Sequence, residues 1–250
     1  MEKGIRLIGH GMIPPERIYN LDSCKFLPFQ HAKQSISATL TANALGEQLP
    51  TGVVATQPDA CSAQLEAVIG SSPNIAYLGE RGTDGAMMCE YVESVLVKQT
   101  GCSKHNPVLL IVDYHTNRLV GFKVCCQRNG IVVHCLPRRS TKFCQPLDAP
   151  PVLPALKKSV VKSKQQAKME GSVEDPISTL FQWSMVEPAI HNIHSGHVAR
   201  VGFEMTGLFP FHPMRLMTNL VRAAPESEDL EVLRGALMAL FQDYALRTQL

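Results

Sequence analysis

"PVLLIVDYH", residues 107–115, gives the clearest strand pattern in the chain. Its five consecutive apolar residues are typical of a strand that is covered on both faces, as in parallel sheets. The run ends at Asp113, after which residues 116–129 are expected to form a helix closed by Gly130. Residues 131–137, IVVHCLP, then predict a second buried strand. A strand, a helix and a strand in this order imply a parallel pair joined by a right-handed crossover.

Further strands are predicted on the N-terminal side of this unit. Residues 16–22, ERIYNLD, are expected to form a short strand that ends in an acid. Residues 35–56 are rich in Thr, Val and small side chains and favour a β-hairpin, and residues 74–80 favour one more strand. Apolar residues at three- and four-residue steps predict a helix over 83–100. The pattern indicates an α/β fold.

The sequence changes character after residue 150. Residues 150–176 begin Pro-rich and then carry several lysines without an acid among them, namely Lys157, Lys158, Lys162, Lys164 and Lys168. This pattern predicts a helix with a basic face followed by a linker. We therefore divide the chain into a domain over 12–155, a basic helix and linker over 156–176, and a C-terminal helical extension over 177–250. The extension includes an amphipathic helix expected at 228–247.

Composition narrows the function classes. The 250 residues are 45% apolar and carry a net charge of +2, so the chain can bury a core and its global charge identifies no partner. No apolar stretch approaches the roughly 18 residues that cross a bilayer, and we see no secretory leader. Eight cysteines without a C-x-x-C pair favour free, mostly buried thiols in a reducing compartment.

Three aspartates occupy special positions in this pattern. Asp22 and Asp113 each end a predicted strand, and Asp148 follows a third strand after a short loop. Parallel strands bring such ends together at one edge of a sheet. Three carboxylates at one place need cations to stay ionised, and two Mg²⁺ or Mn²⁺ ions about 3.5–4 Å apart would supply them and position a phosphodiester for attack. For each acid alone, ordinary turn chemistry remains the alternative.

Two other clusters have competing interpretations. His191, His194 and His197 are three residues apart, but a zinc site needs a fourth ligand, so a surface or packing role is favoured. The lysines of 157–168 could contact DNA phosphates, act as a nuclear import signal or form a solvated helix face.

Several segments together resemble a known family. They are PPERIYNLD, ANALGEQLP, PVLLIVDYH, LPRRSTKFCQPLD and VGFEMTGLFPFHP, in this order along the chain. They look like the DDE superfamily endonuclease domain of pogo and Tigger transposases and of relatives such as jerky and centromere protein B. The resemblance runs from about residue 12 to about residue 213, and QPLD is its most specific element.

The resemblance implies an RNase H-like fold, in which helices flank a mixed sheet and three acids bind Mg²⁺ or Mn²⁺. By motif, the catalytic and metal-binding acids are Asp22, Asp113 and Asp148. The motif residues kept beside them, which are expected to orient the metal ligands, are His115, Thr141 and Gln145. The implied partner is DNA and the implied compartment is the nucleus, with no membrane association.

The neighbours of the acids depart from the family pattern. The family has Asp-Glu-Thr where this chain has Asp22-Ser23-Cys24, and Asp-Asn-His-x-Ser-His where it has residues 113–118, DYHTNR. Two histidines of the family are replaced by Arg139 and Lys142. These cations could pair with Asp148 in place of a metal or grip DNA phosphates. We expect nucleic-acid contacts from Arg139 and Lys142 and from three lysines further on, Lys157, Lys158 and Lys162.

The family also carries helix-turn-helix modules ahead of this domain, whereas the present chain begins close to the first acid. We therefore expect its sequence reader to be missing from this chain. A second copy of the chain, in a homodimer, or another protein is a possible partner. Two hypotheses follow. The first is a transposase-derived, nucleic-acid-binding DDE domain whose ancestral reaction is Mg²⁺-dependent DNA strand cleavage and transfer. The second is a domesticated, non-catalytic module that binds DNA, chromatin or protein.

Overall fold

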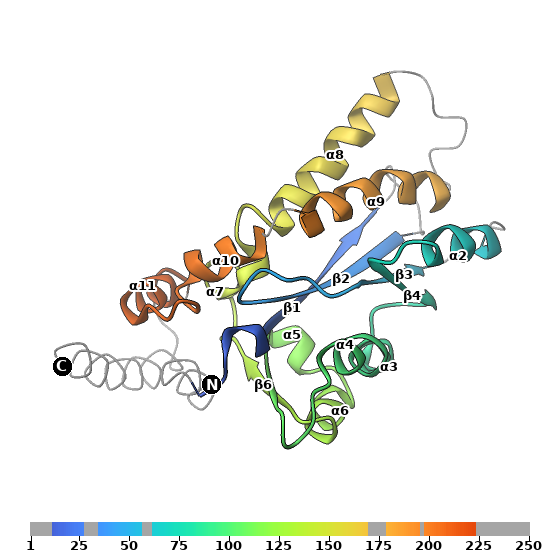
Figure 1. Ribbon diagram of the computed structural model, residues 1–250. Helices are drawn as coiled ribbons and strands as arrows, with labels where there is room; N and C mark the ends of the chain where they lie inside the picture. Colours follow the sequence, from blue (N-terminus) through green and yellow to red (C-terminus); the bar gives the residue numbers. More distant parts are fainter. Residues whose placement is uncertain (1–11, 28–34, 57–61, 170–178, 196–197, 224–250) are drawn as a thin grey trace, which may run out of the picture.

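A six-stranded mixed sheet with helices on both faces forms the centre of the protein (Figure 1). The structure is a computed structural model that describes residues 12–27, 35–56, 62–169, 179–195 and 198–223. Among the described helices, none is long and apolar enough to cross a membrane.

The strand order of the sheet is β4-β3-β2-β1-β5-β6. β1, β5 and β6 run parallel, β2 runs antiparallel to β1 and β3, and β4 is parallel to β3. The parallel pair predicted around PVLLIVDYH is thus confirmed as β5 and β6. The strands are β1 (Ile18–Phe26), β2 (Ser35–Asn43), β3 (Thr51–Thr56), β4 (Ile75–Glu80), β5 (Val108–Val112) and β6 (Ile131–Cys135).

Helices lie on both faces of the sheet. In Figure 1, α8 (Leu153–Met169), α9 (Thr179–Ser195) and α10 (Val198–Thr206) lie above the sheet, while α3 (Gly85–Tyr91), α4 (Lys98–Thr100) and α6 (Phe122–Arg128) lie below it. The other described elements are η1 (Pro15–Arg17), α2 (Ser62–Gly70), η2 (Val92–Val97), α5 (Tyr114–Asn117), α7 (Thr141–Cys144), η3 (Pro146–Asp148) and α11 (Pro213–Ala223).

Each face of the sheet has its own apolar core. On the α8–α9 side, Trp183 and Leu156 pack with strand residues such as Ile36 and Phe26. On the opposite side, side chains of α3, η2 and α6 pack against β5 and β3. A third cluster joins α10 and α11 to β5 through residues such as Phe203. The mixed, helix-flanked sheet confirms the predicted fold class.

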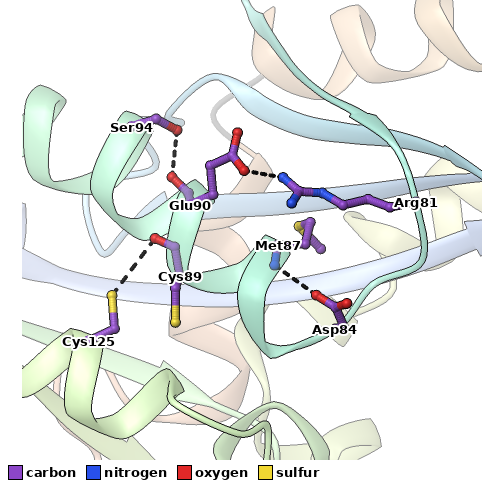
Figure 2. Close-up of polar contacts among 7 residues, drawn as sticks. All are labelled: Arg81, Asp84, Met87, Cys89, Glu90, Ser94 and Cys125. Carbon is purple, nitrogen blue, oxygen red and sulfur yellow. Dashed lines mark hydrogen bonds and ion pairs between the residues drawn. The ribbon is translucent and has the colours of Figure 1, made fainter.

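The α3 helix is fixed by polar contacts at its start and on its outer side (Figure 2). Asp84 caps it, because the carboxylate accepts a hydrogen bond from the Met87 backbone N–H at 2.8 Å. Arg81 forms an ion pair with Glu90. On the side that faces α6, the Cys125 thiol donates to the Cys89 carbonyl at 3.8 Å. The helix predicted over 83–100 is confirmed as the succession of α3, η2 and α4.

Two predicted boundaries were wrong. The first strand does not end at Asp22 but continues to Phe26, because its last four residues pair with β2 from Thr39 to Ile36. The helix predicted over 116–129 is divided into α5 and α6 by a turn at Gly121, whose φ of 80° is left-handed and favours glycine.

The C-terminal half agrees with the sequence where it is described. The basic helix is α8, and α9, α10 and α11 form the described part of the helical extension. The helix predicted at 228–247 lies outside the described residues. The domain boundaries at 155 and 176 stay a prediction.

Candidate active site

The first two acids lie at the same level on neighbouring parallel strands. β1 and β5 pair with a constant offset from Ile18–Leu109 to Asn20–Ile111. Continuing that register places Asp22 beside Asp113, which follows the last residue of β5. By this register Asp22 lies across from Asp113, although Asp22 lies within its strand. The metal-binding role of these two acids stays a prediction.

A buried asparagine ties together the three segments that carry the acids. Asn20 of β1 is fully buried. Its side-chain amide donates to the Ile111 carbonyl of β5 at 2.9 Å, and its side-chain oxygen accepts from the Leu147 backbone N–H of η3 at 2.8 Å. Asn20 itself lies two residues before Asp22. Its partner Ile111 lies two residues before Asp113, and its partner Leu147 lies directly before Asp148. One side chain therefore fixes the relative positions of all three acid-bearing segments.

Asp22 and Asp148 interact directly. Their side chains share a hydrogen bond. Burial, the charge of Asp148 and, more weakly, the charge of Asp113 raise the pKa of Asp22 from 3.8 to about 8, against the lowering effects of the Ser23 backbone N–H and Lys157. Burial also raises the pKa of Asp148. A proton shared by the pair, or a cation, would relieve this repulsion.

A glycine allows the C-terminal helices to hold the third acid. The backbone of α10 lies directly against η3 at Gly202. A Cβ atom at this position would lie 2.2 Å from the Pro146 carbonyl oxygen, far inside van der Waals contact. Since η3 carries Asp148, the small residue in α10 determines how closely the helical extension can approach the acid.

Asp113 lies at the edge of an arginine-rich pocket of about 370 Å³. Its carboxylate caps α5 by accepting from the Thr116 backbone N–H at 2.7 Å. The pocket is also lined by two of the motif residues, His115 and Thr141. Three cations line it as well, namely Arg118 at the end of α5 and Arg138 and Arg139 in the β6–α7 loop. The predicted neighbours His115 and Thr141 therefore do lie beside the second acid.

Tyr114 organises the cations of this pocket. The Arg138 guanidinium lies 4.2 Å from the centre of its ring and donates a hydrogen bond to its hydroxyl, and the Arg118 guanidinium lies 5.5 Å from the same ring. Arg139 has a φ of 63°, which is uncommon for a residue with a Cβ atom and which often accompanies functional loops. The pocket can bind an anion such as a phosphate group.

The other predicted cations lie in different places. Lys142 lies on α7, exposed and 5.4 Å from the Phe143 ring centre. Lys157, Lys158 and Lys162 are exposed on α8. The charge of Lys157 lowers the pKa of both Asp22 and Asp148, so the cation that acts on this acid pair comes from α8 rather than from the β6–α7 loop.

The donor chemistry of the cluster fits Mg²⁺ or Mn²⁺, which prefer oxygen ligands. Gln145, three residues before Asp148, is 1% exposed, and its amide atoms have no hydrogen-bond partner in the described part of the chain. A buried amide of this kind is available to a metal-bound water or a carboxylate. The spacing fits less well, because no three Asp, Glu, His or Cys side chains of the described residues are grouped closely enough to hold an ion.

Asn20 and Gly202 were not identified from the sequence, although both lie in recognised segments, PPERIYNLD and VGFEMTGLFPFHP. Their roles depend on contacts with residues more than fifty positions away, which no local pattern reveals.

Of the three histidines, His194 is buried and bonded within the fold. The His194 ring is within hydrogen-bond distance of the Thr51 hydroxyl, at 2.9 Å, and burial and the neighbouring His191 lower its pKa to about 4. His197 lies outside the described residues.

A family model for the DDE superfamily endonuclease matches residues 33–198, about two thirds of the chain. The protein belongs to the DDE superfamily endonuclease family. The matched region of this DDE domain contains Asp113 and Asp148, while Asp22 lies ahead of it. The mixed sheet flanked by helices is the arrangement that the family resemblance implied.

Among solved structures, the DDE domain is similar to the Mos1 transposase in a paired-end complex with the left transposon end. The two share 10% sequence identity with a TM-score of 0.37, over 80% of this chain and 61% of that one. The chain thus spans less than two thirds of that transposase. No curated protein matches the sequence.

Proposed function

We propose that this DDE domain is transposase-derived, of the pogo and Tigger kind, and that it binds DNA and cleaves a strand with the help of Mg²⁺ or Mn²⁺. The observation that carries the proposal is the bonding of Asn20 to the segments of β5 and η3 that lead to Asp113 and Asp148. Such a buried, fully bonded amide specifies one arrangement of the three acids.

Asp22, Asp113 and Asp148 would hold the metal, with Gln145 bonded to a ligand or water beside them. A bound divalent ion supplies a lowered pKa for the attacking water and neutralises charge on the leaving oxygen. The protein's own cations complete the site. Arg118, Arg138 and Arg139 bind a phosphate of the substrate next to Asp113, and Tyr114 orients two of these guanidinium groups.

The proposal is tested by nicking of supercoiled plasmid in Mg²⁺ or Mn²⁺. The parent should convert supercoiled to open-circular DNA, and Asp148→Asn should abolish the conversion. Asp84→Asn is the matched control, because Asp84 is an acid that caps a different helix, α3, and does not line the pocket of Asp113. A parent without nicking activity at any metal concentration would contradict catalysis.

A non-catalytic DNA-binding or interaction module is the second candidate. Two observations favour it: the described acids do not form a three-ligand group, and the charge of Lys157 already acts on Asp22 and Asp148. This candidate predicts that Asp148→Asn binds DNA as well as the parent while neither protein nicks it. The nucleus as compartment and a dimeric or protein partner stay predictions of the family resemblance.

A further inference from the structure

A second, larger groove lies beside the third acid. It has a volume of about 790 Å³ and is lined by residues of α7, of the loop after η3, of α10 and of α11. Ala149 and Pro150, which directly follow Asp148, form part of its wall. Lys142 forms another part, one residue after Thr141 of the arginine-rich pocket. The wall of the groove therefore includes the residues that directly follow the third acid.

The groove is basic. Its lining includes Lys142, Arg215 and Arg222, and none of its described lining residues is an acid. The Arg215 guanidinium is held in place because it donates to the Glu204 carbonyl oxygen at 2.5 Å. The carboxylate of Glu204 is itself paired with Arg200 at 3.0 Å. No acid of the described lining neutralises the cations of the groove, so these cations can bind the phosphates of a polyanion.

The groove also offers flat and apolar surface between its cations. Phe143 lines it beside Lys142, and Met205 and Met214 lie on α10 and α11 with more than 40% of their surface exposed. α11 is tied to α10, because the Asn219 side chain donates to the Met205 carbonyl at 3.2 Å. Basic residues alternating with an aromatic ring and soft apolar side chains are the pattern that binds single-stranded nucleic acid, whose bases need a surface to stack on.

We propose that this groove holds a single strand of DNA that leads away from the acid cluster, with its phosphates on Arg215, Arg222 and Lys142 and a base against Phe143. A duplex keeps the faces of its bases stacked inside, so no base of a duplex can stack on the apolar part of the groove. The inference rests on the proposed DNA-binding function. It adds that the bound DNA is single-stranded and specifies the residues that contact it.

The test measures binding of a fluorescent oligonucleotide of about 16 nucleotides, single- or double-stranded, by anisotropy at several salt concentrations. Arg215→Glu and Arg222→Glu should each weaken single-strand binding about tenfold. Each should also reduce the slope of the logarithm of the binding constant against the logarithm of salt concentration by about one, the value for one lost phosphate contact. The matched control is Arg128→Glu, which reverses an exposed charge on α6, below the sheet. It should bind like the parent. Equal thermal melting of the variants confirms that they are folded.

Photo-crosslinking identifies the contact independently of any variant. An oligonucleotide that carries 5-iodouracil should crosslink to Phe143 of the full chain, in a peptide found by mass spectrometry. The duplex should give little crosslink and should be less affected by Arg215→Glu.

The outcomes separate this inference from the proposed function. If the parent binds DNA and both groove variants bind as Arg128→Glu does, the groove does not hold DNA and the inference fails. The occupant of the groove would then be a peptide or the chain's own acidic residues 226–231. Equal losses for duplex and single strand without a crosslink at Phe143 overturn the single-strand assignment. A parent that binds no DNA overturns both the inference and the proposed function.

Discussion

Replacing Asn20 by Ala should damage the fold and the acid cluster together. The substitution removes two buried hydrogen bonds, of 2.9 Å and 2.8 Å, and leaves the Leu147 N–H and Ile111 C=O without this partner. Buried groups that lose their partner cost about 1–3 kcal/mol each, so we expect a loss of about 2–5 kcal/mol in the free energy of unfolding. Urea unfolding measures it.

A buried asparagine elsewhere in the sheet provides the control. Asn43 of β2 is also fully buried and bonds to Glu47 and Leu45 in the β2–β3 connection. Asn43→Ala should cost stability as well. Only Asn20→Ala should weaken Mn²⁺ binding, by about 10–100-fold, because only it loosens the segments of the acids. Equal Mn²⁺ affinity in the two folded variants would refute the role given to Asn20.

Three further predictions follow from the site. Gly202→Ala should lower stability by about 1–3 kcal/mol and weaken Mn²⁺ binding, whereas Gly82→Ala, where a Cβ meets no atom within 4 Å, should do neither. In EDTA, the protonated Asp22 should contribute its full stability to the fold below about pH 4, and this contribution should be lost as the pH rises through about 8. Urea unfolding of Asp22→Asn should show a smaller decrease in the free energy of unfolding over this pH range than the parent does. Mn²⁺ at one hundred times its Kd should stabilise the parent by about 2.7 kcal/mol in thermal unfolding, but not Asp148→Asn.

The sheet could be predicted because its strands have strong local patterns. The five buried residues of β5 have no polar interruption, and the Thr- and Val-rich hairpin of β2 and β3 has strong β propensity. The end of β1 could not be predicted, because Asp22 and Ser23 are common turn residues and are held in the strand by pairing with β2. The break at Gly121 was missed because the apolar period continues across it.

The acids of the site could be predicted by motif, but not the contacts that arrange them. The sequence indicated that Asp22, Asp113 and Asp148 would converge, and the charge of each of the other two raises the pKa of Asp22. Asn20 bonds to the segment of Asp148, which is distant in sequence, and Lys157 acts on Asp22 and Asp148 from α8. Their effects depend on tertiary packing of η3 and α8 against β1, which local patterns do not contain.

Calorimetric titration of Mn²⁺ tests most directly whether the three acids form one metal site. The parent and Asp84→Asn should bind Mn²⁺ and release protons at pH 7, since the raised pKa of Asp22 leaves it protonated before the metal enters. Asp113→Asn and Asp148→Asn should each lose this binding by tenfold or more. A parent that takes up no Mn²⁺, or an Asp148→Asn protein that binds as tightly as the parent, would contradict the account.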